Sequence, residues 1–404
     1  MSDTNLGQIQ NRIFVFLYGL FAAMPVIGFA LFNLGIGTNY QQITSLFLMS
    51  FLSLSIYSAF SQHKGFEAAI FSIPLLIYSV VVFVYSYNTV VVKNKTDEVF
   101  GMIMLNFGPH FLGLLFYNFR HLISELTVLK LIFYTGLFIS IVNIILFILL
   151  IIGQYSAVSN YMILLGNENY IESLDVFLRP SGYFFDIHSQ YYLPLFALAI
   201  QKYIGIVKGK KSEFLVYTLI LLALIIGGVK SGYLTLLVLL GYWFFNSITN
   251  VRSYVILALF GIVVLIGDVF TGNTIISLWN RIWSHDIEIL IEHLTFVPIH
   301  LYQDYPSVFI FGGQPRMQSF IYSEVYFVQL ISFIGIVGWA LFYAYPIIFL
   351  LTKRSNPFVK SITIIFALSL LHYAVFRVGV NLFGSALIFY FFYKIQLNRQ
   401  AQVE

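Results

Sequence analysis

Long apolar runs separated by short polar breaks constrain the fold of this chain more than any other feature of its sequence. Of its 404 residues, 59% are hydrophobic and only 9% are charged, whereas a soluble domain carries roughly 25% charged residues. This balance excludes a water-soluble enzyme. A membrane-spanning helix needs about 20 apolar residues, so the apolar sequence suffices for about 12 spans. The sequence therefore predicts an all-α polytopic membrane protein in which residues 1–404 form a single transmembrane domain.

The apolar runs give the expected positions of the spans, and two of the connections between them are long. The runs cover residues 13–33, 43–60, 68–90, 99–118, 131–153, 189–206, 214–228, 232–248, 253–270, 323–351, 361–379 and 380–394. The long connections are residues 154–188 and 271–322. Loops of this length are usually either functional or disordered. Because these two are rich in Tyr, Trp and Ile, we expect them to be ordered.

The distribution of basic residues predicts the orientation. With a cytoplasmic N-terminus and alternating spans, 14 of the 21 Lys and Arg residues lie on the cytoplasmic side, in agreement with the positive-inside rule. Both termini are then cytoplasmic and both long loops are periplasmic. The basic residues left on the outer side are Lys93, Lys95, Arg179, Lys230, Arg281, Arg316 and Arg377.

The second long loop contains apolar residues at helical spacing over residues 281–300. The apolar positions are Ile282, Ile287, Leu290, Ile291 and Leu294, and the acidic residues Asp286, Glu288 and Glu292 lie largely off that stripe. This pattern predicts an amphipathic helix that lies on the outer membrane surface or over a cavity.

Several basic residues on the predicted outer side are candidates for anion binding. Arg179 precedes a turn that contains Pro180 and Gly182, and an Arg fixed there could bind a phosphate with two parallel hydrogen bonds. The alternative is an interfacial Arg that reaches lipid headgroups. Lys230 lies among three glycines in Gly227–Gly232, where exposed backbone amides could bind an anion. The alternative there is an ordinary helical hairpin with one interfacial Lys.

The end of the second loop offers further candidates. Gly312, Gly313 and Arg316 precede Glu324, which lies where the next span begins. A carboxylate that enters a membrane helix is either paired with a cation or used as a base. Arg377, at the outer end of another predicted span, could line a water-filled cavity.

Histidines in the two long loops are the other candidate bases, namely His188 and His300. His110 and His372 lie deep within predicted spans, where a buried, hydrogen-bonded His is the more common case. The chain contains no Cys, no His-Glu-x-x-His motif and no Cys/His cluster. We therefore expect no disulfide, no metal and no cofactor.

Three segments resemble motifs of the Wzy-type O-antigen polymerases and the related O-antigen ligases, which are multi-span bacterial glycosyltransferases. Arg179–Phe185 resembles the Arg-x-x-Gly motif after the first long outer loop, and Lys230–Leu234 resembles a Ser/Arg-rich turn before a later span. The third segment resembles the end of the family's second long loop and the Gly-x-x-Gly span that follows it. It comprises Phe309–Gly313, Glu324 and Gly335–Gly338. Ligases typically carry His eleven residues before the first glycine of that span. Glu324 occupies this position here, which favours a polymerase.

The resemblance implies a GT-C-like fold in the bacterial inner membrane with its active site facing the periplasm. It implies polymerisation of oligosaccharide repeat units linked to undecaprenyl pyrophosphate into O-antigen or a similar surface polysaccharide, without a metal. Arg179, Lys230, Arg316, Arg377, Gly312 and Gly313 would bind the pyrophosphate or substrate, and Glu324, His300 or His188 would assist the attacking hydroxyl. The implied partners are undecaprenyl-pyrophosphate-linked glycans, membrane lipid and a protein that regulates chain length, and no nucleic acid.

Three alternatives remain open from the sequence. The nearest is an O-antigen ligase, which uses the same donor but transfers the glycan to lipid A-core. A lipid-linked oligosaccharide flippase is a transporter of similar size, but shorter loops and cavity charges in both halves are expected of it. A sugar or ion symporter should carry acidic residues in mid-span, whereas only His110 and His372 lie deep in the apolar runs.

Overall fold

The computed structural model is all-helical over the residues that it describes. These are residues 11–20, 22–23, 77, 96–118, 120, 124–154, 156, 190–227, 229–246, 287–312, 325–352, 355–371 and 381–403. The helices are α4 (Thr96–Asn118), α5 (Glu125–Ile151), α7 (Tyr192–Ile204), α8 (Lys210–Gly227), α9 (Lys230–Asn246), α12 (Ile287–Asp304), α13 (Pro306–Phe311), α14 (Tyr326–Trp339), the π-helical turn η6 (Ala340–Ala344), α15 (Tyr345–Thr352), α16 (Pro357–Ser369) and α17 (Asn381–Val403). A further helical segment covers Asn11–Leu20.

Eight of the predicted spans correspond to these helices, and six of them agree at both ends to within about six residues. The run 361–379 extends past the end of α16 at Ser369, and α17 continues past the run 380–394 to Val403. The runs 99–118, 131–153, 189–206, 214–228 and 232–248 correspond to α4, α5, α7, α8 and α9, and the run 323–351 corresponds to α14, η6 and α15. The runs 361–379 and 380–394 correspond to α16 and α17. The runs 43–60, 68–90 and 253–270 lie almost wholly outside the described residues.

Two helical segments in the described part of the chain are long and apolar enough to cross a membrane. They are Glu125–Ile151 and the segment Phe327–Thr352, whose helical backbone is interrupted at Gly335 (φ +71°, ψ 165°). A helix rises about 1.5 Å per residue and the hydrocarbon core is about 30 Å thick, so α7 and α16, with 13 residues each, do not reach across it as they stand.

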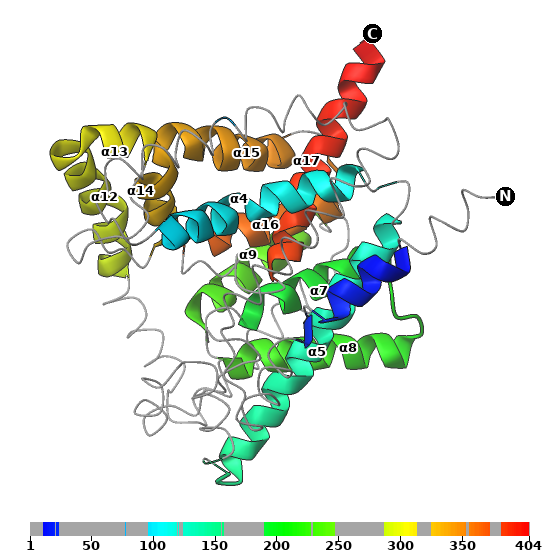
Figure 1. Ribbon diagram of the computed structural model, residues 1–404. Helices are drawn as coiled ribbons and strands as arrows, with labels where there is room; N and C mark the ends of the chain where they lie inside the picture. Colours follow the sequence, from blue (N-terminus) through cyan, green and yellow to red (C-terminus); the bar gives the residue numbers. More distant parts are fainter. Residues whose placement is uncertain are drawn as a thin grey trace.

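α7 lies at the centre of the molecule (Figure 1). Every residue from Tyr192 to Gln201 is buried, as expected for a helix that is apolar on all sides and surrounded by others. α5 packs on one side of it and α16 on another, while α4 crosses α17. The crossing of α5 and α7 is close, because a Cβ on Gly136 would lie 2.5 Å from the Leu193 carbonyl oxygen.

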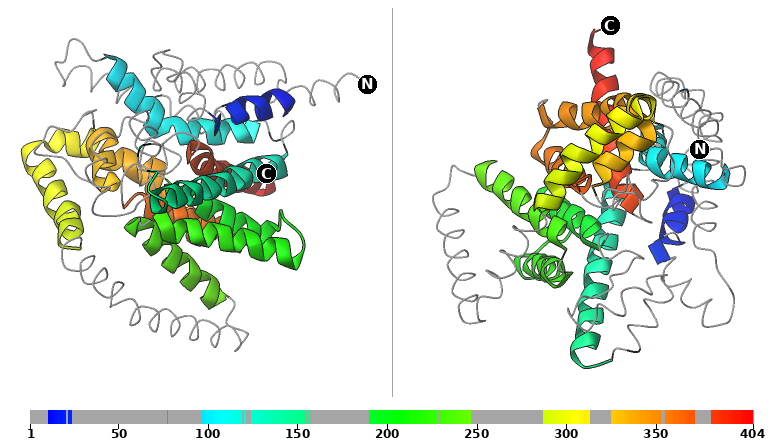
Figure 2. Two further views of the ribbon diagram at one scale, coloured as in Figure 1. Left: turned by 90° about the horizontal axis from the view of Figure 1, so that it is seen from below. Right: turned by 90° about the vertical axis from the view of Figure 1, so that its left-hand side faces the viewer.

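α12 and α13 lie together at the edge of the molecule next to α14 (Figures 1 and 2). Leu301 of α12, Val308 of α13 and Ile331 of α14 form a small core that joins the three helices. α12 therefore packs on protein through one face, which the sequence pattern alone did not indicate.

Candidate functional site

A pocket of about 480 Å³ on α12 contains the one proposed catalytic residue whose side chain the structure describes, His300. The pocket is lined by Glu292, Phe296, Val297, His300, Leu301, Asp304 and Tyr305. Glu292, Phe296, His300 and Asp304 follow one another at intervals of four residues, so the helical repeat brings them onto one flank of α12. Val297 and Leu301 form the floor where the helix packs on its neighbours.

The charged groups of the pocket are a histidine and two carboxylates. His300 Nδ1 lies 4.0 Å from Asp304 Oδ2, and their side chains are 69% and 62% exposed. Water screens such a pair, so it adds little to stability. At 4.0 Å the two atoms do not form a hydrogen bond, so the carboxylate lies near the imidazole without fixing its ring. A nitrogen of the imidazole can accept a proton from a hydroxyl in the pocket. No Lys or Arg occurs between Ile287 and Gly312, so none of the described residues that line the pocket is a Lys or Arg.

The rings beside these groups give the pocket a surface for a sugar. Phe296 is 59% exposed and Tyr305 is 39% exposed. An exposed aromatic ring can stack on the apolar face of a pyranose. In the part of the chain that the structure describes, no group of three His, Cys, Asp or Glu side chains is arranged to hold a metal ion.

Gly312 serves the packing of α13 on α14. It follows α13 with φ +80°, and Gly335 within α14 has φ +71°. A Cβ on Gly312 would overlap the Phe333 carbonyl oxygen, and one on Gly335 would overlap the Ile310 carbonyl oxygen. The two glycines therefore allow the backbones of α13 and α14 to contact each other. The sequence predicted substrate binding for Gly312 and did not indicate this packing role.

Lys230 is the first residue of α9, and the described residues around it contact the start of α7. A Cβ on Gly232 would lie 2.9 Å from the Tyr191 ring, and Gln190 Nε2 donates a hydrogen bond to the Gly227 carbonyl at 3.1 Å. Tyr192 at the start of α7 is linked to Ser385 of α17, with their hydroxyl oxygens 2.9 Å apart. The start of α7 thus contacts the end of α8, the start of α9 and the first turns of α17.

The other residues predicted for the site lie outside the described residues. They are Arg179, His188, Gly313, Arg316, Glu324 and Arg377. The structure therefore brings together His300, Asp304 and Glu292, and it gives no positions for these six.

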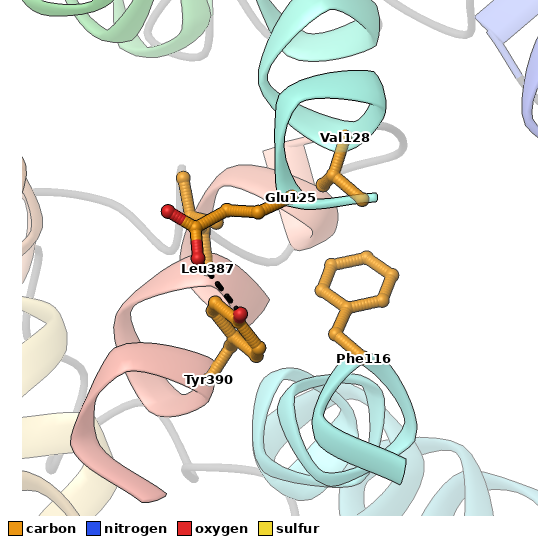
Figure 3. A pocket seen from close by; sticks show the side chains of 5 residues that line it. All are labelled: Phe116, Glu125, Val128, Leu387 and Tyr390. Carbon is orange, nitrogen blue, oxygen red and sulfur yellow. Dashed lines mark hydrogen bonds between the residues drawn. The ribbon is translucent and has the colours of Figure 1, made fainter. Parts of the chain in front are cut away.

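A second polar group lies where α4, α5 and α17 meet (Figure 3). Glu125 Oε2 accepts hydrogen bonds from the Tyr390 hydroxyl at 2.8 Å and from Lys394 Nζ at 2.5 Å. The cavity beside it, lined by Phe116, Val128 and Leu387, holds only about 10 Å³, which is roughly one water molecule. This group joins helices and has no room for a substrate.

His110 is buried among aromatic rings. Its Nδ1 lies 3.1 Å from the Tyr393 hydroxyl, and its ring lies against Phe389 with centroids 3.6 Å apart. Tyr343, within the π-helical turn η6, contacts the same ring and donates a hydrogen bond to the Asn106 carbonyl. This arrangement agrees with the expectation of a hydrogen-bonded core histidine.

Asp304 and Glu292 were not among the candidates taken from the sequence. The signal for Asp304 was present, because an acidic residue four positions after a His on a helix lies beside it. Glu125 and Lys394 carried no such signal, since 269 residues separate them.

Comparisons with known proteins identify no relative of this chain. No family model, no curated protein and no solved structure matches the chain.

Proposed function

We propose that this protein is a multi-pass glycosyltransferase of the bacterial inner membrane that polymerises lipid-linked repeat units at the periplasmic face, in the manner of the Wzy-type O-antigen polymerases. The observation that carries the proposal is the α12 pocket, in which His300, Asp304 and Glu292 lie beside Phe296 and Tyr305. A base, a carboxylate near it that can stabilise its protonated form, and exposed rings that can hold a sugar are groups that suit transfer to a sugar hydroxyl.

In the proposed reaction, a hydroxyl of the acceptor repeat unit attacks the anomeric carbon of the donor glycan. The bond from that carbon to the pyrophosphate oxygen breaks, and undecaprenyl pyrophosphate leaves with the bonding electrons. His300 accepts the hydroxyl proton, and Asp304 stabilises the resulting imidazolium. The leaving group is already activated, so the remaining requirement is to stabilise the charge that develops on the pyrophosphate.

That stabilisation is assigned to Arg179, Lys230, Arg316 and Arg377. The described residues that line the α12 pocket include no Lys or Arg, so these residues suit the acceptor better than the pyrophosphate. Glu324 and His188 stay as alternative bases.

The contacts between helix ends support the predicted alternation of the spans. On the predicted outer side, the start of α7 meets the start of α17 through Tyr192 and Ser385. The Phe327 amide at the start of α14 donates to the Leu370 carbonyl at the end of α16, at 2.8 Å.

The predicted inner side shows matching contacts. Glu125 at the start of α5 pairs with Lys394 of α17. Lys202 near the end of α7 lies 4.8 Å from the Trp243 ring of α9, and Trp243 Nε1 donates to Ser361 Oγ near the start of α16. In these contacts, helix ends that the charge distribution assigns to the same side of the membrane lie next to one another.

Deletion of the gene tests the proposal. Surface polysaccharide from the deletion strain should show core carrying a single repeat unit, whereas loss of a ligase or flippase leaves core with none. A strain without the single-repeat band would contradict polymerase activity.

Point variants then test the pocket. In the deletion strain, His300→Ala should fail to restore long chains at normal protein levels. Gln303→Ala is the matched control, because Gln303 is an exposed polar residue on the same helix that does not line the pocket. Normal ladders with His300→Ala would assign catalysis to another base.

A further inference from the structure

α12 presents three different faces around its axis. One face packs on α13 and α14 through Val297 and Leu301. A second carries the polar pocket of Glu292, His300 and Asp304. The third carries Ile291, Thr295, Ile299 and Tyr302, at the intervals of three and four residues that align side chains on a helix. We call this third face the apolar stripe of α12.

The apolar stripe contacts little of the protein. Ile291, Ile299 and Tyr302 are 54%, 50% and 57% exposed. Three large side chains exposed in one row are unusual for a surface that faces water. α12, which carries the row, lies with α13 at the left edge of the molecule in Figure 1 and in the left view of Figure 2, and both helices face the viewer in the right view of Figure 2.

The polar atoms of the stripe suit an apolar medium. Thr295 Oγ1 donates to the Ile291 carbonyl at 2.6 Å, so its hydroxyl needs no partner from water. The four residues of the stripe are uncharged, but two acidic residues of α12 border it: Glu288 precedes Ile291 by three positions, and Glu292 precedes Ile299 by seven. Tyr302 stacks edge-on with Phe309 of α13, with ring centroids 5.5 Å apart, and tyrosines are enriched where membrane and water meet.

The same kind of surface continues on the helices to which α12 is attached. Ile310 and Phe311 of α13 are exposed. On the membrane-spanning candidate Phe327–Thr352, Val337, Leu341 and Ile348 form a second exposed apolar row. Since α12 packs directly on this candidate span through Leu301 and Ile331, lipid that surrounds the span also reaches α12.

We propose that the apolar stripe of α12 lies in the hydrocarbon of the outer leaflet, which holds the polar pocket at the boundary between lipid and water. Phe296, which lines the pocket, lies between Ile299 and His300 around the helix axis, so the stripe and the pocket are continuous. A lipid-linked substrate could place its sugar beside His300 while its tail stays in the bilayer. This last consequence rests on the proposed function; the position of the stripe does not.

The chain contains no Cys, so single-cysteine variants of the full-length protein test this placement directly. A charged, membrane-impermeant maleimide reacts with thiolates in water and not with thiols in hydrocarbon. The variants are Ile291→Cys and Ile299→Cys on the stripe, and Asp304→Cys and Gln303→Cys as matched exposed controls on the same helix. Labelling is measured in spheroplasts, in inverted vesicles and in phosphatidylcholine vesicles that contain only the purified protein.

The stripe variants should label at least about tenfold more slowly than the controls in spheroplasts and in phosphatidylcholine vesicles, and equally fast after denaturation in SDS. Equal labelling before denaturation would show that the stripe faces water and would overturn the proposal. Protection in spheroplasts that is lost in phosphatidylcholine vesicles would show that another protein covers the stripe, which also overturns it. Controls that label from inverted vesicles alone would place the stripe at the inner leaflet and would also overturn the proposal.

Discussion

The crossing of α5 and α7 predicts a large effect from the addition of one methyl group. In Gly136→Ala, the new Cβ would lie 2.5 Å from the Leu193 carbonyl oxygen and 2.8 Å from the Ala197 Cβ. The carbonyl belongs to the backbone of the central helix and cannot turn aside. Overpacking of this kind costs about 1–3 kcal/mol. The gain in helix propensity from Gly to Ala offsets about 1 kcal/mol, which leaves a net loss of roughly 2 kcal/mol at the upper end.

Gly241→Ala is the matched control for this prediction. Gly241 lies within α9, and a Cβ there would meet no atom within 4 Å. The control should gain up to about 1 kcal/mol from helix propensity alone. The assay is unfolding of the full-length protein in mixed micelles of increasing SDS content, followed by circular dichroism. If both variants unfold at the same SDS fraction, α5 and α7 do not cross at Gly136.

Three further predictions concern the other contacts. Glu125→Gln, Lys394→Met and the double variant should show a coupling of about 0.2–1 kcal/mol in the same assay, because the two side chains are 34% and 38% exposed and water screens the pair. Additive effects, which correspond to a coupling of zero, would mean that the ion pair does not form. Gly335→Ala should destabilise the protein by at least about 1 kcal/mol, because φ is +71° and the Ile310 carbonyl occupies the Cβ position. If the variant is as stable as the wild type, α13 does not pack on α14 at this glycine. In an assay of polymer formation, His300→Ala should lower the rate at least about 100-fold, as expected for loss of a general base. Asp304→Asn should lower the rate less than about tenfold, because the pair is exposed. A larger loss with Asp304→Asn than with His300→Ala would make Asp304 the base.

The sequence predicted the positions of helices better than their surroundings. α4, α5 and α9 coincide with apolar runs because burial in an apolar medium selects long stretches of apolar residues. The same pattern could not distinguish a helix that crosses a membrane from one such as α7, whose residues from Tyr192 to Gln201 are enclosed by other helices. An apolar sequence predicts apolar surroundings for a helix, but it does not indicate whether those surroundings are lipid or protein.

The candidate site was predicted only in part, and the limits have physical causes. His300 was predicted because it is a histidine in a long loop. Its neighbour Asp304 was not predicted, although an acidic residue four positions after a His on a helix lies beside it. The backbone contact between Gly312 and Gly335 could not be predicted, because it depends on the packing of two helices joined by a long connection. The same holds for the pair of Glu125 and Lys394, whose distance in space has no trace in the local sequence.

The most direct measurement of the proposed activity uses purified full-length protein in lipid nanodiscs. The substrate is the undecaprenyl-pyrophosphate-linked repeat unit extracted from a strain that lacks this gene. We predict products of two or more repeat units, with one undecaprenyl pyrophosphate released for each new linkage, and no such products with His300→Ala. If the folded wild-type protein leaves the substrate unchanged, it is not the polymerase that we propose.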